Sequence, residues 1–122
     1  MALYTSSYDA MLMREKKAGD VYIQVSRDLG HFENPDDTTG LVKLIDENWG
    51  EEFGNWWNNA HDYKKAVRKK DLRAFAKHLR ALDGRDVFLL CFENVLKGEV
   101  CHRLWLSDIL RRGYGLKIAE FL

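Results

Sequence analysis

The chain of 122 residues has one proline, two cysteines and no net charge, because 19 Lys and Arg balance 19 Asp and Glu. Proteins that hold duplex nucleic acid mainly through summed positive charge need a net positive field, so the balance argues against that class and leaves room only for a local basic patch. Two cysteines are too few for a disulfide scaffold. We expect both to be reduced thiols.

Long apolar runs are also missing, since no stretch approaches the roughly 18 apolar residues of a membrane-spanning helix. The first seven residues lack the basic and apolar regions of a secretory signal. We therefore expect a cytoplasmic protein with no membrane partner. The composition, 46% hydrophobic and 31% charged, supplies enough apolar surface for one packed core, and we expect a single domain over residues 1–122.

Four segments have the composition of strands. Residues 3–6 and 20–27 are short runs rich in β-branched and aromatic residues, and residues 116–121 resemble them. Residues 87–92 form a continuous apolar run without alternation, which is typical of a strand buried on both faces. This last run predicts the middle strand of a parallel sheet.

The apolar spacing of helices occurs in residues 71–82 and in residues 104–110. In residues 71–82, apolar side chains recur every three or four positions between Asp71, predicted as the N-cap, and an Asp-Gly stop signal. Residues 104–110 show the same spacing, and Gly113 predicts the end of that helix.

The remaining segments are less regular. Residues 8–18 predict a short helix or an irregular crossover, and residues 28–40 predict a long loop rich in turn formers. The apolar residues of 41–49 share one helical face, and Gly50 predicts the end of that helix. Residues 53–63 crowd aromatics with asparagines and indicate a loop or a broken helix.

The order of these elements is strand, crossover, strand, helices, strand, helix, strand. This alternation predicts an α/β fold with right-handed crossovers. We expect one compact, Rossmann-like domain with a small, mainly parallel sheet of about four strands flanked by helices.

Polar residues follow the predicted strands. In an open parallel sheet, ligands bind beyond the carboxyl ends of the strands, where loops and helix N-termini converge. The rule predicts one polar rim made of Thr5, Ser6, Ser7, Tyr8, Ser26, Arg27, Cys91, Phe92, Glu93, Cys101, His102 and Arg103.

The helix that begins near His102 offers an anion site. Its unpaired N–H groups and positive dipole end favour a negative ligand, and Arg103 with a protonated His102 would add to the attraction. The alternative is that Arg103 pairs with Glu93 or with another carboxylate, and that His102 is a partly exposed side chain.

Cys91 is a candidate nucleophile, because a thiol near a helix N-terminus and an arginine is readily deprotonated. The alternative is a small core residue within an apolar strand. Cysteine phosphatases place an arginine six positions after the thiol, but Lys97 stands there after Cys91 and Ser107 after Cys101.

Metal and cofactor motifs are weak or missing. Cys91, Cys101 and His102 lack the paired spacing of structural zinc sites, so we predict no metal. The glycine-rich patterns of dinucleotide and P-loop sites do not occur, and we predict no cofactor.

Residues 64–73 are rich in Lys and Arg, and they follow Trp56, Trp57 and Tyr63 closely in the sequence. Cations beside aromatic rings can contact phosphates and stack on bases. The alternative is a solvated helix face.

The block Leu89-Leu90-Cys91-Phe92-Glu93, followed by Cys101-His102-Arg103, resembles the family catalogued as domain of unknown function 488. The segments Tyr4-Thr5-Ser6-Ser7-Tyr8 and Val25-Ser26-Arg27 resemble the same family at its first two strands. The resemblance implies a compact α/β domain of bacteria and bacterial viruses and a shared site at the cysteine, histidine and arginine block. It implies no particular reaction.

These observations leave three functional hypotheses, with the oligomeric state open. The first is binding of a small anionic ligand, such as a nucleotide or a nucleotide-derived signal sequestered by a phage protein. Arginines would bind its phosphate, serines would add hydrogen bonds, and an aromatic ring would stack on its base. This set comprises Arg27, Arg103, Ser6, Ser7, Ser26, Tyr8 and Trp56.

The second hypothesis is an enzyme that acts on nucleotides or nucleic acid, with Cys91 or Glu93 as nucleophile or base and His102 as proton carrier. It requires these groups to converge on one reacting atom. The third hypothesis is an interaction module that uses Trp56 and Trp57 as an apolar patch.

Overall fold

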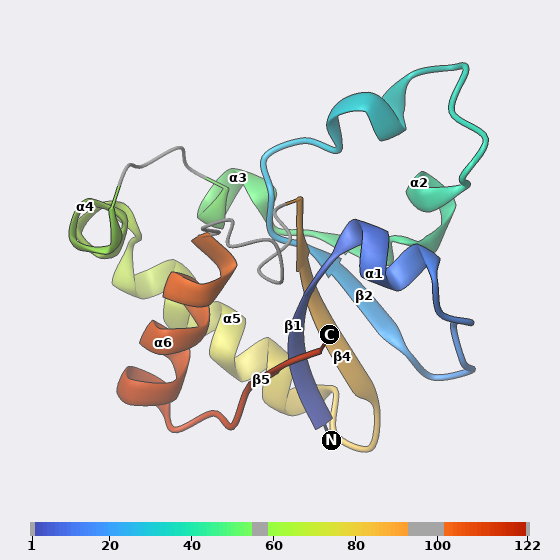
Figure 1. The fold of residues 1–122 in the computed structure, drawn as a ribbon. Helices are drawn as coiled ribbons and strands as arrows, with labels where there is room; N and C mark the ends of the chain where they lie inside the picture. Colours follow the sequence, from blue (N-terminus) through green and yellow to red (C-terminus); the bar gives the residue numbers. More distant parts are fainter. Residues whose placement is uncertain (1, 55–58, 93–101, 122) are drawn as a thin grey trace.

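The computed structural model of the chain describes residues 2–54, 59–92 and 102–121. Five strands, all paired in parallel, form one sheet in the order β3-β2-β4-β1-β5 (Figure 1). The strands are β1 (Ala2–Ser7), β2 (Val21–Gln24), β3 (Glu47–Asn48), β4 (Asp86–Cys91) and β5 (Ala119–Glu120). The predicted α/β class and parallel sheet are confirmed, with five strands in place of about four.

Strand β4 lies in the middle of the sheet, as its continuous apolar run predicts. Its neighbours are β1, in the register Ser7 to Cys91, and β2, in the register Gln24 to Leu90. The carboxyl ends of the three strands therefore lie at one edge of the sheet.

Helices cover both faces of the sheet (Figure 1). One face carries α1 (Tyr8–Leu12), the 3-10 helix η1 (Gly30–Glu33) and α2 (Leu41–Leu44), and the other carries α3 (Gly50–Phe53), α4 (Ala60–Ala66), α5 (Lys69–Ala81) and α6 (His102–Tyr114). Side chains of β4 alternate between the faces: Phe88 and Leu90 pack towards α1, whereas Leu89 and Cys91 pack towards α6. No helix in these described ranges has the length and apolar character needed to cross a membrane.

The prediction of a helix over residues 41–49 is wrong beyond Leu44, where α2 ends. The chain turns extended at Ile45, and the backbone N–H of Trp49 donates to the carbonyl of Gln24 at 2.8 Å. This pairing creates β3 beside β2, so sheet formation overrides the helical spacing. Gly50 begins α3 and does not end a helix.

The N-cap of α5 also differs from the prediction. Arg68 occupies the cap position, and Asp71 lies inside the first turn. A carboxylate in the first turn of a helix interacts favourably with the helix dipole. Asp71 therefore stabilises the start of α5 from the third helical position and not, as predicted, from the cap position.

Asp20, just before β2, ties the α1–β2 connection to the sheet. Burial raises the pKa of this carboxyl, but the hydrogen bonds from Arg14 Nη1 (2.7 Å) and from the backbone N–H of Lys17 (2.9 Å) outweigh burial, and the pKa lies below its ordinary value of 3.8. The stabilisation is therefore complete above about pH 4 and is lost as the pH falls through the lowered pKa of the folded state.

We expect Asp20→Asn to lower the free energy of unfolding at pH 7 by about 2 kcal/mol, because hydrogen bonds to a charged group are lost. Urea denaturation between pH 7 and pH 2 should show the difference from the unchanged chain closing as acid protonates Asp20. Asp36→Asn, at an exposed loop position, is the control and should show no difference. If the difference in unfolding free energy between Asp20→Asn and the unchanged chain did not depend on pH, the stabilisation would not come from the charge of Asp20.

Candidate functional site

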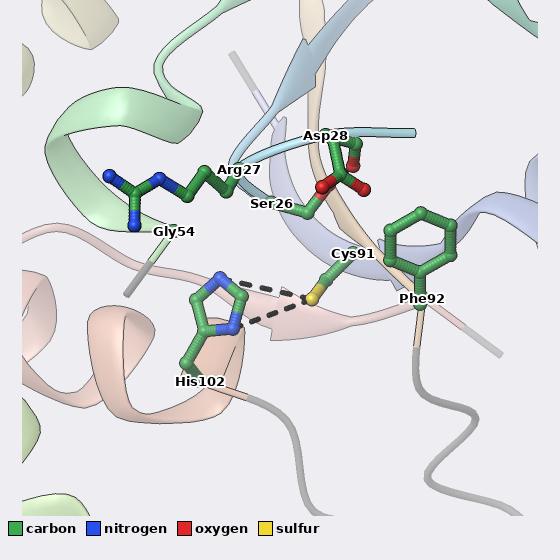
Figure 2. Close-up of a pocket in the computed structure, with 7 residues that line it drawn as sticks. All are labelled: Ser26, Arg27, Asp28, Gly54, Cys91, Phe92 and His102. Carbon is green, nitrogen blue, oxygen red and sulfur yellow. Dashed lines mark hydrogen bonds between the residues drawn. The ribbon is translucent and has the colours of Figure 1, made fainter. Parts of the chain in front are cut away.

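Cys91 and His102 face each other at the carboxyl edge of the sheet (Figure 2). Cys91 is the last residue of β4 and points to the face that α6 covers, and His102 is the first residue of α6. The Cys91 Sγ atom lies 3.6 Å from His102 Nδ1 and 3.8 Å from Nε2. Thiol and imidazole are therefore within reach for proton transfer.

The ring of His102 is held from two sides. Its Nε2 atom lies 2.8 Å from the carbonyl oxygen of Val25, just beyond β2. Because a carbonyl only accepts hydrogen bonds, we assign the proton of the neutral ring to Nε2, so that Nδ1 carries the lone pair of the ring. The ring of Tyr63 packs at 5.7 Å between centroids, and its own hydroxyl donates to the carbonyl of Phe53 at 2.8 Å.

A hollow of about 260 Å³ opens beside this pair. Its lining residues are Ser26, Arg27, Asp28, Gly54, Cys91, Phe92 and His102, which Figure 2 shows around the thiol. The volume of about 260 Å³ includes open solvent at the mouth of the hollow, and the comparable enclosed space is only about 10 Å³. The hollow as it stands therefore has room for about one water molecule.

The hollow carries both charge signs. Arg27 is exposed at its rim, and Asp28 contributes a carboxylate whose Oδ1 accepts from the backbone N–H of Gly30 at 2.9 Å. The Ser26 hydroxyl donates to the carbonyl of Asp28 at 2.6 Å, so the 2.6 Å contact with Tyr8 is one in which the tyrosine donates. Ser26 thus has no proton left to donate to an anion.

Two glycines place α3 directly against the end of β2. A Cβ on Gly50 would lie 1.8 Å from the carbonyl oxygen of Ser26, and a Cβ on Gly54 would lie 2.3 Å from the backbone nitrogen of Arg27. This close approach sets the wall of the hollow. Sequence reasoning used Gly50 only as the predicted end of a helix and did not single out Gly54.

Three predicted rim residues, Thr5, Ser6 and Ser7, lie elsewhere in the structure. Ser6 Oγ donates to the carbonyl of Phe121 at 2.7 Å, and Ser7 Oγ caps α1 by accepting from the backbone N–H of Ala10 at 3.1 Å. Neither serine lines the hollow. The expectation that they join Ser26 and His102 in one hollow is therefore corrected.

Arg103 also lies away from the hollow, because its side chain is only 1% exposed and binds Glu120. Its Nε and Nη2 atoms donate to the two carboxylate oxygens at 3.2 and 2.9 Å. The alternative of a carboxylate partner was open, and Glu120 fills that role. A bidentate pair of this kind leaves the guanidinium little capacity to bind a ligand phosphate.

The structure joins five residues of the predicted rim around one hollow, namely Ser26, Arg27, Cys91, Phe92 and His102. Tyr8 is hydrogen-bonded to Ser26. Glu93, Cys101, Trp56 and Trp57 fall outside the described residues, and the predictions for them stay predictions. Asp28 is a lining residue that no motif indicated.

Within the described ranges, no three His, Cys, Asp or Glu side chains gather where they could hold a metal ion. Comparison with family models, with curated proteins and with solved structures finds no match to this chain. The resemblance to domain of unknown function 488 therefore stays a prediction that rests on its quoted motifs alone.

Proposed function

We propose that the chain is a thiol-dependent enzyme of the acyl-transfer class, with Cys91 as the nucleophile and His102 as the base. The observation that supports the proposal is the 3.6 Å contact between Cys91 Sγ and a His102 ring whose far nitrogen is held by the Val25 carbonyl. Nucleophile, base and orienting group are the three parts that covalent catalysis by a thiol requires.

The reaction would proceed in two stages. The Cys91 thiol gives its proton to His102 Nδ1, and the sulfur attacks the carbonyl carbon of an ester or thioester substrate, which forms an acyl-enzyme thioester. His102 returns the proton to the departing alkoxide or thiolate. Water then attacks the thioester with His102 as base, which releases the carboxylic acid and restores the thiol.

The size of the hollow limits the substrate. The enclosed space holds about one water molecule, so the lining must shift for a short acyl group to reach the sulfur, and the rest of the substrate, a nucleotide included, would lie outside. A phosphoryl transfer is less well supported, because Lys97 stands where a cysteine phosphatase has its arginine.

The geometry favours this chemistry over simple binding of an anion. Arg103 is bound to Glu120, the hydroxyl proton of Ser26 is used within the protein, and Asp28 adds a carboxylate to the hollow. Among the described lining residues, Arg27 is then the single permanent cation. One cation beside one carboxylate makes a poor phosphate site.

The first test is the rate at which iodoacetamide alkylates Cys91 in a Cys101→Ser background. We expect His102→Gln to slow this reaction at pH 7 by about 100-fold, since the base that takes the thiol proton is lost. His78→Gln is the matched control: His78 is also partly buried and hydrogen-bonded, to Glu47, and the rate should not change.

A purely structural cysteine gives the opposite result. Its alkylation would depend on transient opening of the fold, so His102→Gln would loosen the packing and raise the rate. A second readout uses p-nitrophenyl acetate as the probe: an acetyl adduct on Cys91, found by mass spectrometry and missing from Cys91→Ala, is expected. No adduct together with a faster-reacting His102→Gln protein would refute the proposal.

A further inference from the structure

The chain is neutral overall but electrically polarised. Residues 60–81, which contain α4 and α5, hold eight Lys or Arg and two Asp, a net charge of +6. The other hundred residues hold eleven Lys or Arg and seventeen Asp or Glu, a net charge of −6. This concentration of cations plays no part in the thiol chemistry proposed above.

An open groove with about 550 Å³ of space lies on this basic segment, between α4, α5 and α6. Lys64, Lys69 and Arg73 supply its cations. Ile109 and Tyr114, both half-buried on α6, supply apolar surface. The groove is thus a partly apolar trough bordered by positive charge.

Most of the positive charge of the groove is not neutralised within the protein. The side chains of Lys69 and Arg73 are exposed and form no ion pair or hydrogen bond with the described residues. Lys64 does bind Asp108, but the same carboxylate also lies near Arg111 and Arg112, so one acid faces three bases.

The cations of α5 have a regular spacing. Lys69, Arg73 and Lys77 stand four residues apart on one exposed stripe, which places them about 6 Å apart along the helix axis. A partner helix with an acidic residue at every fourth position repeats its carboxylates at the same interval. Its neighbouring apolar side chains would lie over Ile109 and Tyr114.

We infer that this groove is the docking site for an acidic, amphipathic helix of a protein partner. Single-stranded nucleic acid is the competing polyanion, but it needs successive aromatic rings on which its bases stack. Tyr114 is the one aromatic side chain among the described residues that line the groove. Charge complementarity with an apolar strip therefore favours the peptide.

Fluorescence anisotropy of a labelled helical peptide tests the inference. The probe carries Glu at every fourth position with Leu on the adjoining face, and a scrambled peptide of the same composition and a labelled oligo(dT) are the comparisons. We expect the probe to bind more tightly than either, with Lys69→Glu/Arg73→Glu weakening it at least tenfold. The matched control is Lys17→Glu/Lys43→Glu, which makes the same charge change at exposed positions before β2 and on α2.

The outcomes separate the alternatives. Equal binding of probe and scrambled peptide, or equal loss in both double variants, would mean attraction to net charge alone and would overturn the inference. Tighter binding of oligo(dT) that depends on Lys69 and Arg73 would overturn it in favour of nucleic acid. Loss confined to the groove variant supports it, and iodoacetamide reactivity of Cys91 in the same variant confirms that the fold is intact.

Discussion

Glu120→Ala is expected to lower the free energy of unfolding by about 3 kcal/mol, measured by urea denaturation at pH 7. The substitution leaves the guanidinium of Arg103, 1% exposed, without the carboxylate that it binds through two hydrogen bonds. It also removes the acceptor of the 2.6 Å hydrogen bond from Thr5 Oγ1. A buried guanidinium that loses a carboxylate partner keeps its desolvation cost without the compensation of that ion pair, which is why the effect is large.

Removing both charges should lower the free energy of unfolding much less than removing Glu120 alone. Arg103→Met/Glu120→Leu replaces the ion pair with apolar side chains, and such replacements are often neutral. Glu15→Ala, at an exposed carboxylate before β2, is the control and should change stability by less than about 0.5 kcal/mol. A Glu120→Ala protein as stable as the control would show that the pair does not anchor β5.

Gly50→Ala is expected to destabilise the protein by about 3 kcal/mol or more, because the added Cβ would lie 1.8 Å from the carbonyl oxygen of Ser26. Backbone atoms cannot rotate out of the way as a side chain can. Helix α3 or the chain after β2 must therefore move, and Ser26 and Arg27 line the hollow beside Cys91. We also expect the alkylation rate of Cys91 to change.

Gly113→Ala is the matched control, since Gly113 also lies in a helix but a Cβ there meets no atom within 4 Å. Alanine favours the helix over glycine by roughly 0.5–1 kcal/mol, so this variant should be slightly more stable than the unchanged chain. Equal unfolding free energies of the Gly50→Ala and Gly113→Ala proteins would contradict the prediction. They would show that the close approach of Gly50 to Ser26 does not limit stability.

The central strand and the long helices could be predicted from the chain alone. An apolar run such as residues 87–92 buries itself in any fold that has a core, and the spacing of residues 71–82 suits one helical face in any surroundings. Short elements were beyond such reasoning. Strand β3 has two residues, too few for any period, and it exists because the backbone of β2 is beside it.

The residues of the candidate site could likewise be predicted only in part from the sequence. The rule that parallel strands present their carboxyl ends at one edge was enough to group Ser26, Arg27, Cys91 and His102 from the sequence. It could not tell that Arg103, next to His102, turns away to Glu120. Adjacent residues at a helix start point in different directions, and the direction of each is settled by packing.

The sequence by itself thus determined the α/β class, the central position of β4 and the placement of Ser26, Arg27, Cys91 and His102 at the carboxyl edge, since these follow from local composition and a general property of parallel sheets. Only the tertiary structure decided which of those side chains meet. The contacts that orient His102 and bury Arg103 join Val25 to His102 across 77 positions and Arg103 to Glu120 across 17. Such contacts depend on how distant segments pack, which no local pattern records.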